Sequence, residues 1–198
     1  MGLYAVGAAV GGAALLMASG PAAANVPPFN PSPAPAPDSG PGGSPDEGDA
    51  PVPSNDPDAN VHALLEALLL AESNGDYGAL VGGGHTDDLS HHPAFTDASN
   101  TTRSAWKGWR NSHAAGGWQF QPQTWIEAGS ATGAQDFSPA AQKTAAVYLL
   151  QRRGALADVR AGNIQAALFK LTNEWQSVPV RGNAWFVAQY SDNGGFVA

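Results

Sequence analysis

The apolar positions between Asp56 and Gly75 recur with the spacing of an α-helix. Asp56 can cap the amino end, Pro57 is favoured at the first helical position, and Gly75 suits the carboxyl end. The pattern therefore predicts a helix that starts at Pro57, ends at Gly75 and has one apolar face. The apolar positions of that face are Val61, Leu64, Leu65, Leu68 and Leu69.

Helical signals return in the carboxyl-terminal half of the chain. They predict helices at Pro122–Ala128 closed by Gly129, at Pro139–Arg153 between Ser138 and Gly154, from Asn163 to Trp175, and at Ala184–Tyr190. The stretch from Asp76 to Gly117 is rich in Gly, His, Asp and Thr and lacks helical spacing. We expect a small sheet and long loops there. The fold class predicted is α+β, mostly α, with a small β lobe.

Two segments that cannot build a core precede this domain. Leu3–Ser19 is an uncharged apolar run, with an A-x-A cleavage pattern at 22–24. We interpret 1–24 as a secretory signal or a membrane anchor, since the run is at the short limit for spanning a bilayer. Residues 25–57 contain eleven prolines and predict a disordered Pro/Gly/Asp-rich tether. The folded domain is expected over 58–198.

Composition excludes several functional classes. The chain carries 9 Lys and Arg against 17 Asp and Glu, a net charge of −8, and lacks the basic clusters that nucleic acid requires. Cysteine is absent, which excludes disulfides, a Cys-type zinc site and a thiol nucleophile.

Glu72 falls on the predicted apolar stripe, in register with Leu64, Leu65 and Leu68. Lost hydration and the negative end of the helix dipole would both raise the pKa of its carboxyl group. A carboxyl that stays protonated near neutral pH can give a proton to a glycosidic oxygen. The alternative is a helix-end acid paired with an arginine.

Short motifs follow Glu72 in a definite order. Tyr77 comes first, followed by an aliphatic-Val-Gly-Gly turn at Leu80–Gly83. Later motifs are Asp88–Pro93, Ala115–Phe120, Asp136–Pro139, Arg153–Leu156 and Asn173–Pro179. The ordered set covers Leu64 to about Pro179 and resembles the lambda-phage endolysin family of lytic transglycosylases. Glu72 stands where that family has its catalytic Glu. Gly117 and Trp118 depart from the Arg and Tyr of the family pattern.

The resemblance implies a lysozyme-like fold and cleavage between N-acetylmuramic acid and N-acetylglucosamine in peptidoglycan glycan strands. The muramic 6-hydroxyl would attack without water and leave a 1,6-anhydro end, with Glu72 as the single acid and base. One alternative is a muramidase that uses Asp76, Asp87 or Asp88 as a second carboxylate. Another is a non-catalytic wall-binding or virion module.

Several side chains are candidates for substrate binding. Gln119 follows a Gly-Gly turn, from which its amide could meet an acetamido group or Glu72, or else be buried in a strand. Trp106 and Trp109 lie in a polar segment and could stack on sugars, with Lys107 and Arg110 beside them suited to anionic peptide stems. Family position adds Tyr77, Trp118 and Asn173. Trp125 and Trp175 fall on helical faces and are expected in the core.

A metal site is a further interpretation of one histidine-rich region. The possible ligands are His85, Asp87, Asp88, His91, His92 and His113, but none shows HExxH spacing. We therefore expect no metal and no cofactor. We expect a monomer exported to the periplasm or cell envelope, or anchored in a host or virion membrane through the amino-terminal segment, with the catalytic domain outside the cytoplasm.

Overall fold

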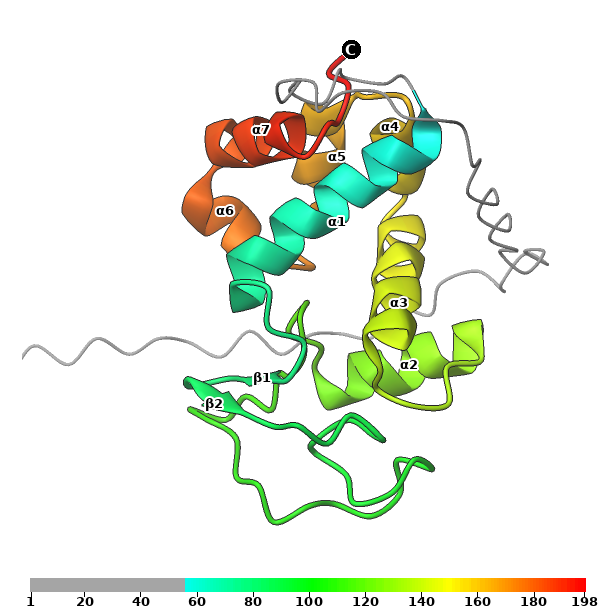
Figure 1. Ribbon diagram of the computed structural model, residues 1–198, viewed down its shortest axis with the longest axis vertical. Coiled ribbons are helices and arrows are strands. Elements are labelled where there is room, and N and C mark those ends of the chain that lie inside the picture. The colour runs from blue at the N-terminus through cyan, green and yellow to red at the C-terminus, as the bar shows by residue number, and fades with distance from the viewer. Residues whose placement is uncertain (1–55) are drawn as a thin grey trace, which may run out of the picture. The chain divides into compact units, whose positions relative to one another are not determined.

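The computed structural model describes residues 56–198 of the chain. The signal or anchor at 1–24 and the tether at 25–57, apart from its last two residues, lie outside the described residues. Within 56–198 the chain forms seven helices and one two-stranded sheet (Figure 1). In chain order these are α1 Pro57–Ser73, β1 Ala79–Leu80, β2 Gly84–His85, α2 Pro122–Thr132, α3 Pro139–Arg152, α4 Leu156–Arg160, α5 Ile164–Leu171, α6 Ser177–Arg181 and α7 Asn183–Asp192.

The first predicted helix is confirmed as α1. The Asp56 side chain accepts a hydrogen bond from the backbone N–H of Asp58 at 2.9 Å and so caps the amino end. At the carboxyl end, Asn74 adopts the left-handed conformation with φ of 57° and donates its backbone N–H to Leu70. The helix therefore ends at Ser73, slightly before the predicted stop at Gly75.

The later helices agree with the prediction in place more than in length. The predicted stop at Gly129 is wrong, because α2 continues to Thr132 and Gly133, with φ of 75°, caps it. The helix expected from Asn163 to Trp175 ends at Leu171, after which the chain turns. The five-residue helices α4 and α6 were not predicted.

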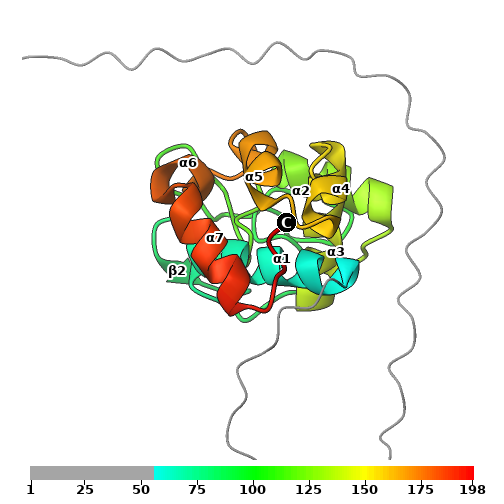
Figure 2. The same cartoon turned by 90° about the horizontal axis from the view of Figure 1, so that it is seen from above.

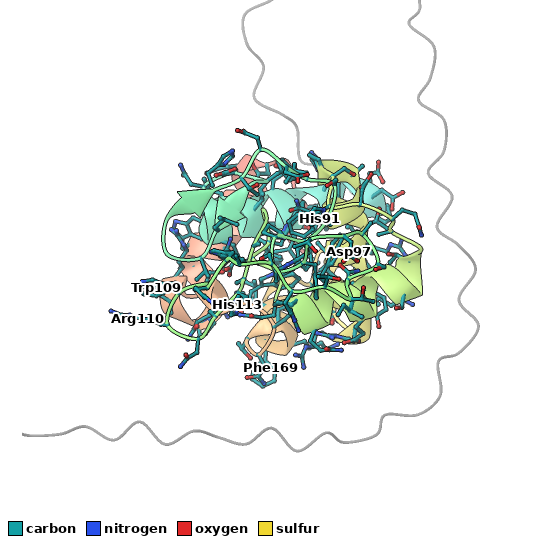
Figure 3. The ribbon with its side chains drawn as sticks, turned by 90° about the horizontal axis from the view of Figure 1, so that it is seen from below. His91, Asp97, Trp109, Arg110, His113 and Phe169 are labelled. Carbon is teal, nitrogen blue, oxygen red and sulfur yellow. The ribbon has the colours of Figure 1, made fainter. Side chains whose placement is uncertain are left out.

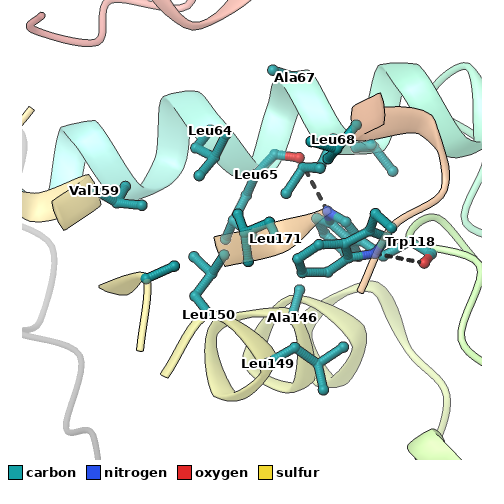
Figure 4. Packing of buried hydrophobic residues seen from close by; sticks show 14 of the residues in the cluster. Leu64, Leu65, Ala67, Leu68, Trp118, Ala146, Leu149, Leu150, Val159 and Leu171 are labelled. Atoms are coloured by element: carbon teal, nitrogen blue, oxygen red, sulfur yellow. Dashed lines mark hydrogen bonds between the residues drawn. The ribbon is translucent and has the colours of Figure 1, made fainter. Parts of the chain in front are cut away.

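The hydrophobic core is organised around α1. Helices α3, α4, α6 and α7 all contact α1, and both views show α7 running beside it (Figures 1 and 2). The leucines of the predicted stripe are buried, and Figure 4 shows them packed against residues of α3 and α5. We call α1 and α3–α7 the helical lobe.

The segment between α1 and α2, residues 76–121, forms the small β lobe that was predicted. Strand β1 pairs antiparallel with β2, and the turn between them uses Gly82 and Gly83, both at φ near 90°. Single bridges join Leu80 to Ala115 and Ala115 to Phe120, which ties the hairpin to the tight turn that ends the lobe.

Gln142 of α3 joins the β lobe to the helical lobe through hydrogen bonds. Its side chain is fully buried. The amide nitrogen donates to the carbonyls of Tyr77 and Phe137, and Oε1 accepts the backbone N–H of Gly117 at 2.8 Å. One buried amide therefore satisfies backbone groups from both ends of the β lobe. Among the described residues, no helix has the length and apolarity needed to cross a membrane.

Candidate active site

Glu72 lies in the last turn of α1 and is partly buried. Its Oε1 accepts a hydrogen bond from the backbone N–H of Ser177, the first residue of α6, at 3.2 Å. Loss of hydration raises the pKa of the Glu72 carboxyl, and this effect outweighs the hydrogen bonding from Ser177 and the positive charge of Arg181, which lower it. The carboxyl group thus holds its proton to a higher pH than an ordinary glutamate.

The interpretation of Glu72 as an arginine-paired helix end is wrong. Within 56–198 Glu72 forms no ion pair. The guanidinium group of Arg181 instead donates to the carbonyl of Ala71 at 3.3 Å and lies 4.4 Å from the ring centre of Trp185. Arg181 therefore binds a carbonyl at the end of α1 and acts on Glu72 only through its charge, which lowers the pKa of the carboxyl group.

The Ser177 hydroxyl is a second polar group of this site. Its oxygen is buried and has no hydrogen-bond partner within the described residues. It is nevertheless close enough to Glu72 to lower the pKa of the carboxyl group. The hydroxyl therefore belongs to the immediate surroundings of the Glu72 carboxyl group.

The three candidate second carboxylates have partners of their own. Asp76 accepts from the backbone N–H of Gly78 at 2.8 Å and pairs with His85 Nδ1 at 2.9 Å. Desolvation raises the pKa of Asp76, but the hydrogen bonds from His85 and Gly78 together lower it below its usual range. The Asp87 side chain is fully exposed and pairs with the other nitrogen of His85.

Asp88, the third candidate, accepts hydrogen bonds from both the backbone N–H and the hydroxyl of Ser90. The Ser90 hydroxyl contributes most to holding the pKa of Asp88 below its usual range. No carboxylate of the described residues contributes to the raised pKa of Glu72 by charge repulsion.

Tyr77 and Gln119 lie where the two lobes meet. Tyr77 is partly buried. Its ring lies edge-on to that of Trp118, with the two ring centres 5.7 Å apart. The Gln119 amide nitrogen donates to the carbonyls of Ala79 and Gly116, so the predicted alternative of a bond to Glu72 is wrong. Its Oε1 makes no hydrogen bond within 56–198 and is partly accessible.

The prediction that Trp118 contacts substrate is contradicted by its burial. Only 1% of the residue is exposed, and its indole N–H donates to the carbonyl of Leu65 at 3.1 Å (Figure 4). The Trp118 carbonyl in turn accepts from the indole N–H of Trp175. Trp118 therefore belongs to the core, as do Trp125 and Trp175, which were predicted there.

Gly117 explains how Trp118 reaches this position. A Cβ at Gly117 would collide with the Leu69 side chain. The absence of a side chain where the family has Arg therefore lets this turn approach α1 closely. The same close approach carries the neighbouring Trp118 ring into the core.

The remaining candidates are accessible. Trp106 is partly buried, lies edge-on to His113, and lines two hollows of the β lobe, neither of which includes Glu72. Trp109 is 47% exposed and projects with Arg110 at the edge of the molecule (Figure 3). Asn173 is exposed, with its carbonyl bound by Arg153.

The histidine-rich segment is organised by hydrogen bonds. His92 is fully buried, its Nε2 bonds the carbonyl of Phe120 at 2.8 Å, and its Nδ1 accepts the backbone N–H of Ala94. Both ring nitrogens are thus occupied by backbone groups. Within 56–198, no group of three or more His, Asp or Glu side chains is placed to hold a metal ion.

The sequence of this protein is similar to those of known phage endolysins. The Endolysin family profile matches residues 63–194. The chain is 30% identical to the endolysin of Escherichia phage lambda over 131 residues, which cover 63% of this chain and 78% of that protein. It is 32% identical to the endolysin of Escherichia phage P2 over 136 residues, covering 62% and 81%.

Two solved structures share the fold. One is bacteriophage lambda lysozyme complexed with a chitohexasaccharide, which matches with a TM-score of 0.58 and 28% identity over 71% of this chain and 97% of that one. The other, lysozyme from bacteriophage lambda, matches with a TM-score of 0.57 and 24% identity at the same coverage. The predicted lysozyme-like fold is therefore confirmed. The family profile spans both Glu72 and Ser177, and the chain belongs to the endolysin family of lysozyme-like, peptidoglycan-degrading enzymes.

Proposed function

We propose that this endolysin is a lytic transglycosylase that cleaves the bond between N-acetylmuramic acid and N-acetylglucosamine with Glu72 as its only acid and base. The observation that carries the proposal is the environment of Glu72. Burial raises the pKa of its carboxyl group, and no carboxylate among residues 56–198 is a cause of that raised pKa. Such a group is suited to donating a proton near neutral pH.

The reaction needs one group that both gives and accepts a proton. Protonated Glu72 donates its proton to the glycosidic oxygen as the bond from that oxygen to the muramic anomeric carbon breaks. The muramic 6-hydroxyl oxygen then bonds to the anomeric carbon, and its proton passes to Glu72. The carboxyl group is thereby restored, the product is a 1,6-anhydro end, and no water is consumed. The attack is intramolecular, which lowers its entropic cost.

The hydrogen-bond and ion-pair partners of the three candidate second carboxylates favour this mechanism over hydrolysis. A hydrolase of this kind uses two carboxylates about 5 to 9.5 Å apart. Asp76 and Asp87 are paired through His85, and Asp88 is bound by Ser90. These partners hold the pKa of Asp76 and Asp88 below the usual range, which supports a mechanism that depends on Glu72 alone.

Digestion of purified sacculi tests the proposal, with the soluble fragments identified by mass spectrometry. Fragments with anhydro ends are expected, together with a loss of roughly 10³-fold in rate for Glu72→Gln, which keeps the shape but cannot donate the proton. The rate should also fall as pH rises through the raised pKa of Glu72. Reducing ends would show a muramidase, and no release by the wild type beyond that of the variant would contradict the proposal.

We propose that the glycan is held by Tyr77, Gln119, Trp106, Trp109 and Asn173. The related lambda lysozyme binds a chitohexasaccharide, whose N-acetylglucosamine units carry the acetamido groups that also occur in peptidoglycan. The free Oε1 of Gln119 can accept an acetamido N–H. The exposed ring of Trp109 offers a flat apolar surface for a sugar face.

We propose that the enzyme acts outside the cytoplasmic membrane, either exported or held by the apolar run at Leu3–Ser19. Sequencing the amino terminus of the mature protein from membrane and soluble fractions tests this. An amino terminus just after residue 24 indicates a cleaved signal, and an uncut chain in the membrane fraction indicates an anchor. An uncut chain found in the cytosol alone would contradict both.

A further inference from the structure

A basic hollow lies on the β lobe, apart from Glu72. It has a volume of about 480 Å³, within the range of pockets that hold small ligands. It is formed where the loop at 103–107 and the loop that contains His113 meet the start of α2. Its principal polar and aromatic lining residues are Arg103, Trp106, Lys107, His113, Gln121 and Gln123.

The charge of the hollow is opposite to that of the protein. The chain has a net charge of −8, yet no carboxylate is among the described residues that line the hollow. Arg103 and Lys107 form no ion pair within 56–198, whereas Arg152 and Arg153 both pair with Glu174. The guanidinium carbon of Arg103 lies 4.5 Å from the ring centre of Phe95, but no carboxylate neutralises either cation, so both charges can attract a bound anion.

A neighbouring buried group is consistent with the positive potential. Burial is the largest cause that lowers the pKa of His92, to about 4, and the charges of Arg103 and His113 act in the same direction. Arg103 and His113 both line the hollow, so the groups that act on His92 are the ones that a ligand in the hollow would meet.

The remaining lining suits an amide-containing ligand. The ring of Trp106 forms an apolar wall of the hollow. It lies edge-on to the ring of His113, with the two ring centres 5.4 Å apart. The Gln123 side chain makes no hydrogen bond within 56–198 and can donate and accept. Gln121 instead bonds Ser112 and the backbone of His113, and so holds the loop in place. The start of α2 adds the positive end of a helix dipole.

We infer that the basic hollow binds the carboxylates of the peptide stems carried by muramic acid in peptidoglycan. This inference rests on the proposed glycan-cleaving function, because that substrate presents free peptide carboxylates next to the cleaved bond. Arg103 and Lys107 meet the carboxylates, and Trp106 and Gln123 contact the peptide backbone. A bare phosphate would use the cations but leave the apolar wall and the free amide without partners.

A kinetic comparison of two substrates tests the inference. The substrates are soluble glycan strands that carry tetrapeptide stems and the same strands after an amidase has removed the stems. The double variant R103Q/K107Q removes both charges, and R103K/K107R keeps them. For the first variant, the ratio of kcat/KM on stem-carrying strands to that on stem-free strands should fall roughly tenfold. The second variant should keep the wild-type ratio.

A binding measurement separates this inference from the proposed function. Addition of free stem tetrapeptide should shift the indole N–H signal of Trp106 in NMR spectra of the wild type, and amidation of the peptide carboxyls should abolish the shift. A ratio of kcat/KM unchanged in R103Q/K107Q, with no shift on adding peptide, overturns the inference alone. Inorganic phosphate that shifts the signal as strongly as the peptide at equal concentration also overturns it. Failure of wild type to cleave either substrate contradicts the proposed function, and the peptide titration still decides the inference.

Discussion

The helical lobe and the β lobe are stabilised in different ways. In the helical lobe, α1 alone buries eight residues, and most of the core lies on regular helices. In the β lobe each strand has two residues, and several loop positions take the left-handed conformation, including Arg110, Asn111 and Gln119. The lobe that packs tightly supplies the desolvated acid, and the loop-rich lobe carries most of the exposed groups that we propose for substrate contact. Burial of an acid needs apolar packing, whereas binding a polymer needs accessible side chains.

The largest effect on stability is expected where the two lobes share a side chain. Trp118→Ala would remove a ring that fills the core between them and a hydrogen bond to Leu65. The free energy of unfolding should fall by about 3–5 kcal/mol, as measured by urea denaturation. Trp118→Phe, which keeps a ring of similar character, should lose less. A loss below about 0.5 kcal/mol for the alanine variant would show that Trp118 is not a core residue.

Acid should loosen the β lobe before the helical lobe. Burial lowers the pKa of His92 to about 4 in the folded protein, against 6.5 for the free group. Folding therefore favours the neutral ring of His92. The contribution of this ring to the free energy of unfolding is complete above pH 6.5 and is lost as pH falls through about 4. The difference corresponds to roughly 3 kcal/mol. Protonation at Nδ1 would also set that nitrogen against the N–H of Ala94.

Hydrogen exchange measured by NMR at pH 7 and pH 4.5 checks this prediction. After correction for intrinsic rates, the amide of Ala94 should lose more protection at the lower pH than the amides of Leu65 and Leu68 in α1. His92→Gln is the matched control, because an amide has no charge to gain over this range. Equal loss of protection in both lobes would contradict the proposed difference between them.

Glu72→Gln should stabilise the protein at neutral and alkaline pH. The pKa of Glu72 is raised in the folded state, so its ionised form opposes folding above that pKa. The amide of Gln keeps an acceptor for the N–H of Ser177 and carries no charge. Thermal unfolding should give a higher Tm for the variant at pH 8 and little difference at pH 3, where the carboxyl is protonated in both states. A lower Tm at pH 8 would mean that the carboxylate is a stabilising group.

The smallest effect on stability is expected at the edge of the β lobe. Trp109 contacts the backbone at Gly82 and lies 4.2 Å from the guanidinium carbon of Arg110, but it is half exposed. Trp109→Ala should change the free energy of unfolding by less than about 1 kcal/mol. It should raise KM for glycan strands about fivefold, equivalent to about 1 kcal/mol, and leave kcat nearly unchanged. A fall in kcat at unchanged KM would argue against a role in binding.

Local signals were sufficient for much of the fold. Capping residues and a continuous apolar face predicted α1 and α3 to within about two residues. The same face indicated the desolvation of Glu72, because spacing on a helix fixes which residues share its buried side. The β lobe was predicted from the loss of helical spacing, although its register was not.

Other features depend on contacts between distant residues. Gly129 and Gly133 are equally good local stops, and only packing around the buried Ala128 decides that α2 continues. Helices of five residues, such as α4 and α6, are too short to show a period. Family position suggested that Trp118 contacts substrate, whereas the close approach of Gly117 to Leu69 brings the ring into the core. Spacing also gave no sign that Ser177 would bond Glu72.

The hydrogen bond between Glu72 and Ser177 joins residues 105 positions apart, and this separation bears on synthesis. During translation, Glu72 emerges from the ribosome long before the start of α6 does. Until then the carboxyl group of the nascent chain is hydrated and has the proton affinity of any glutamate in solution. A chain interrupted before Ser177 therefore contains the proposed acid without α6 beside it. On the proposed mechanism, cleavage of peptidoglycan begins only after the carboxyl-terminal helices have packed against α1.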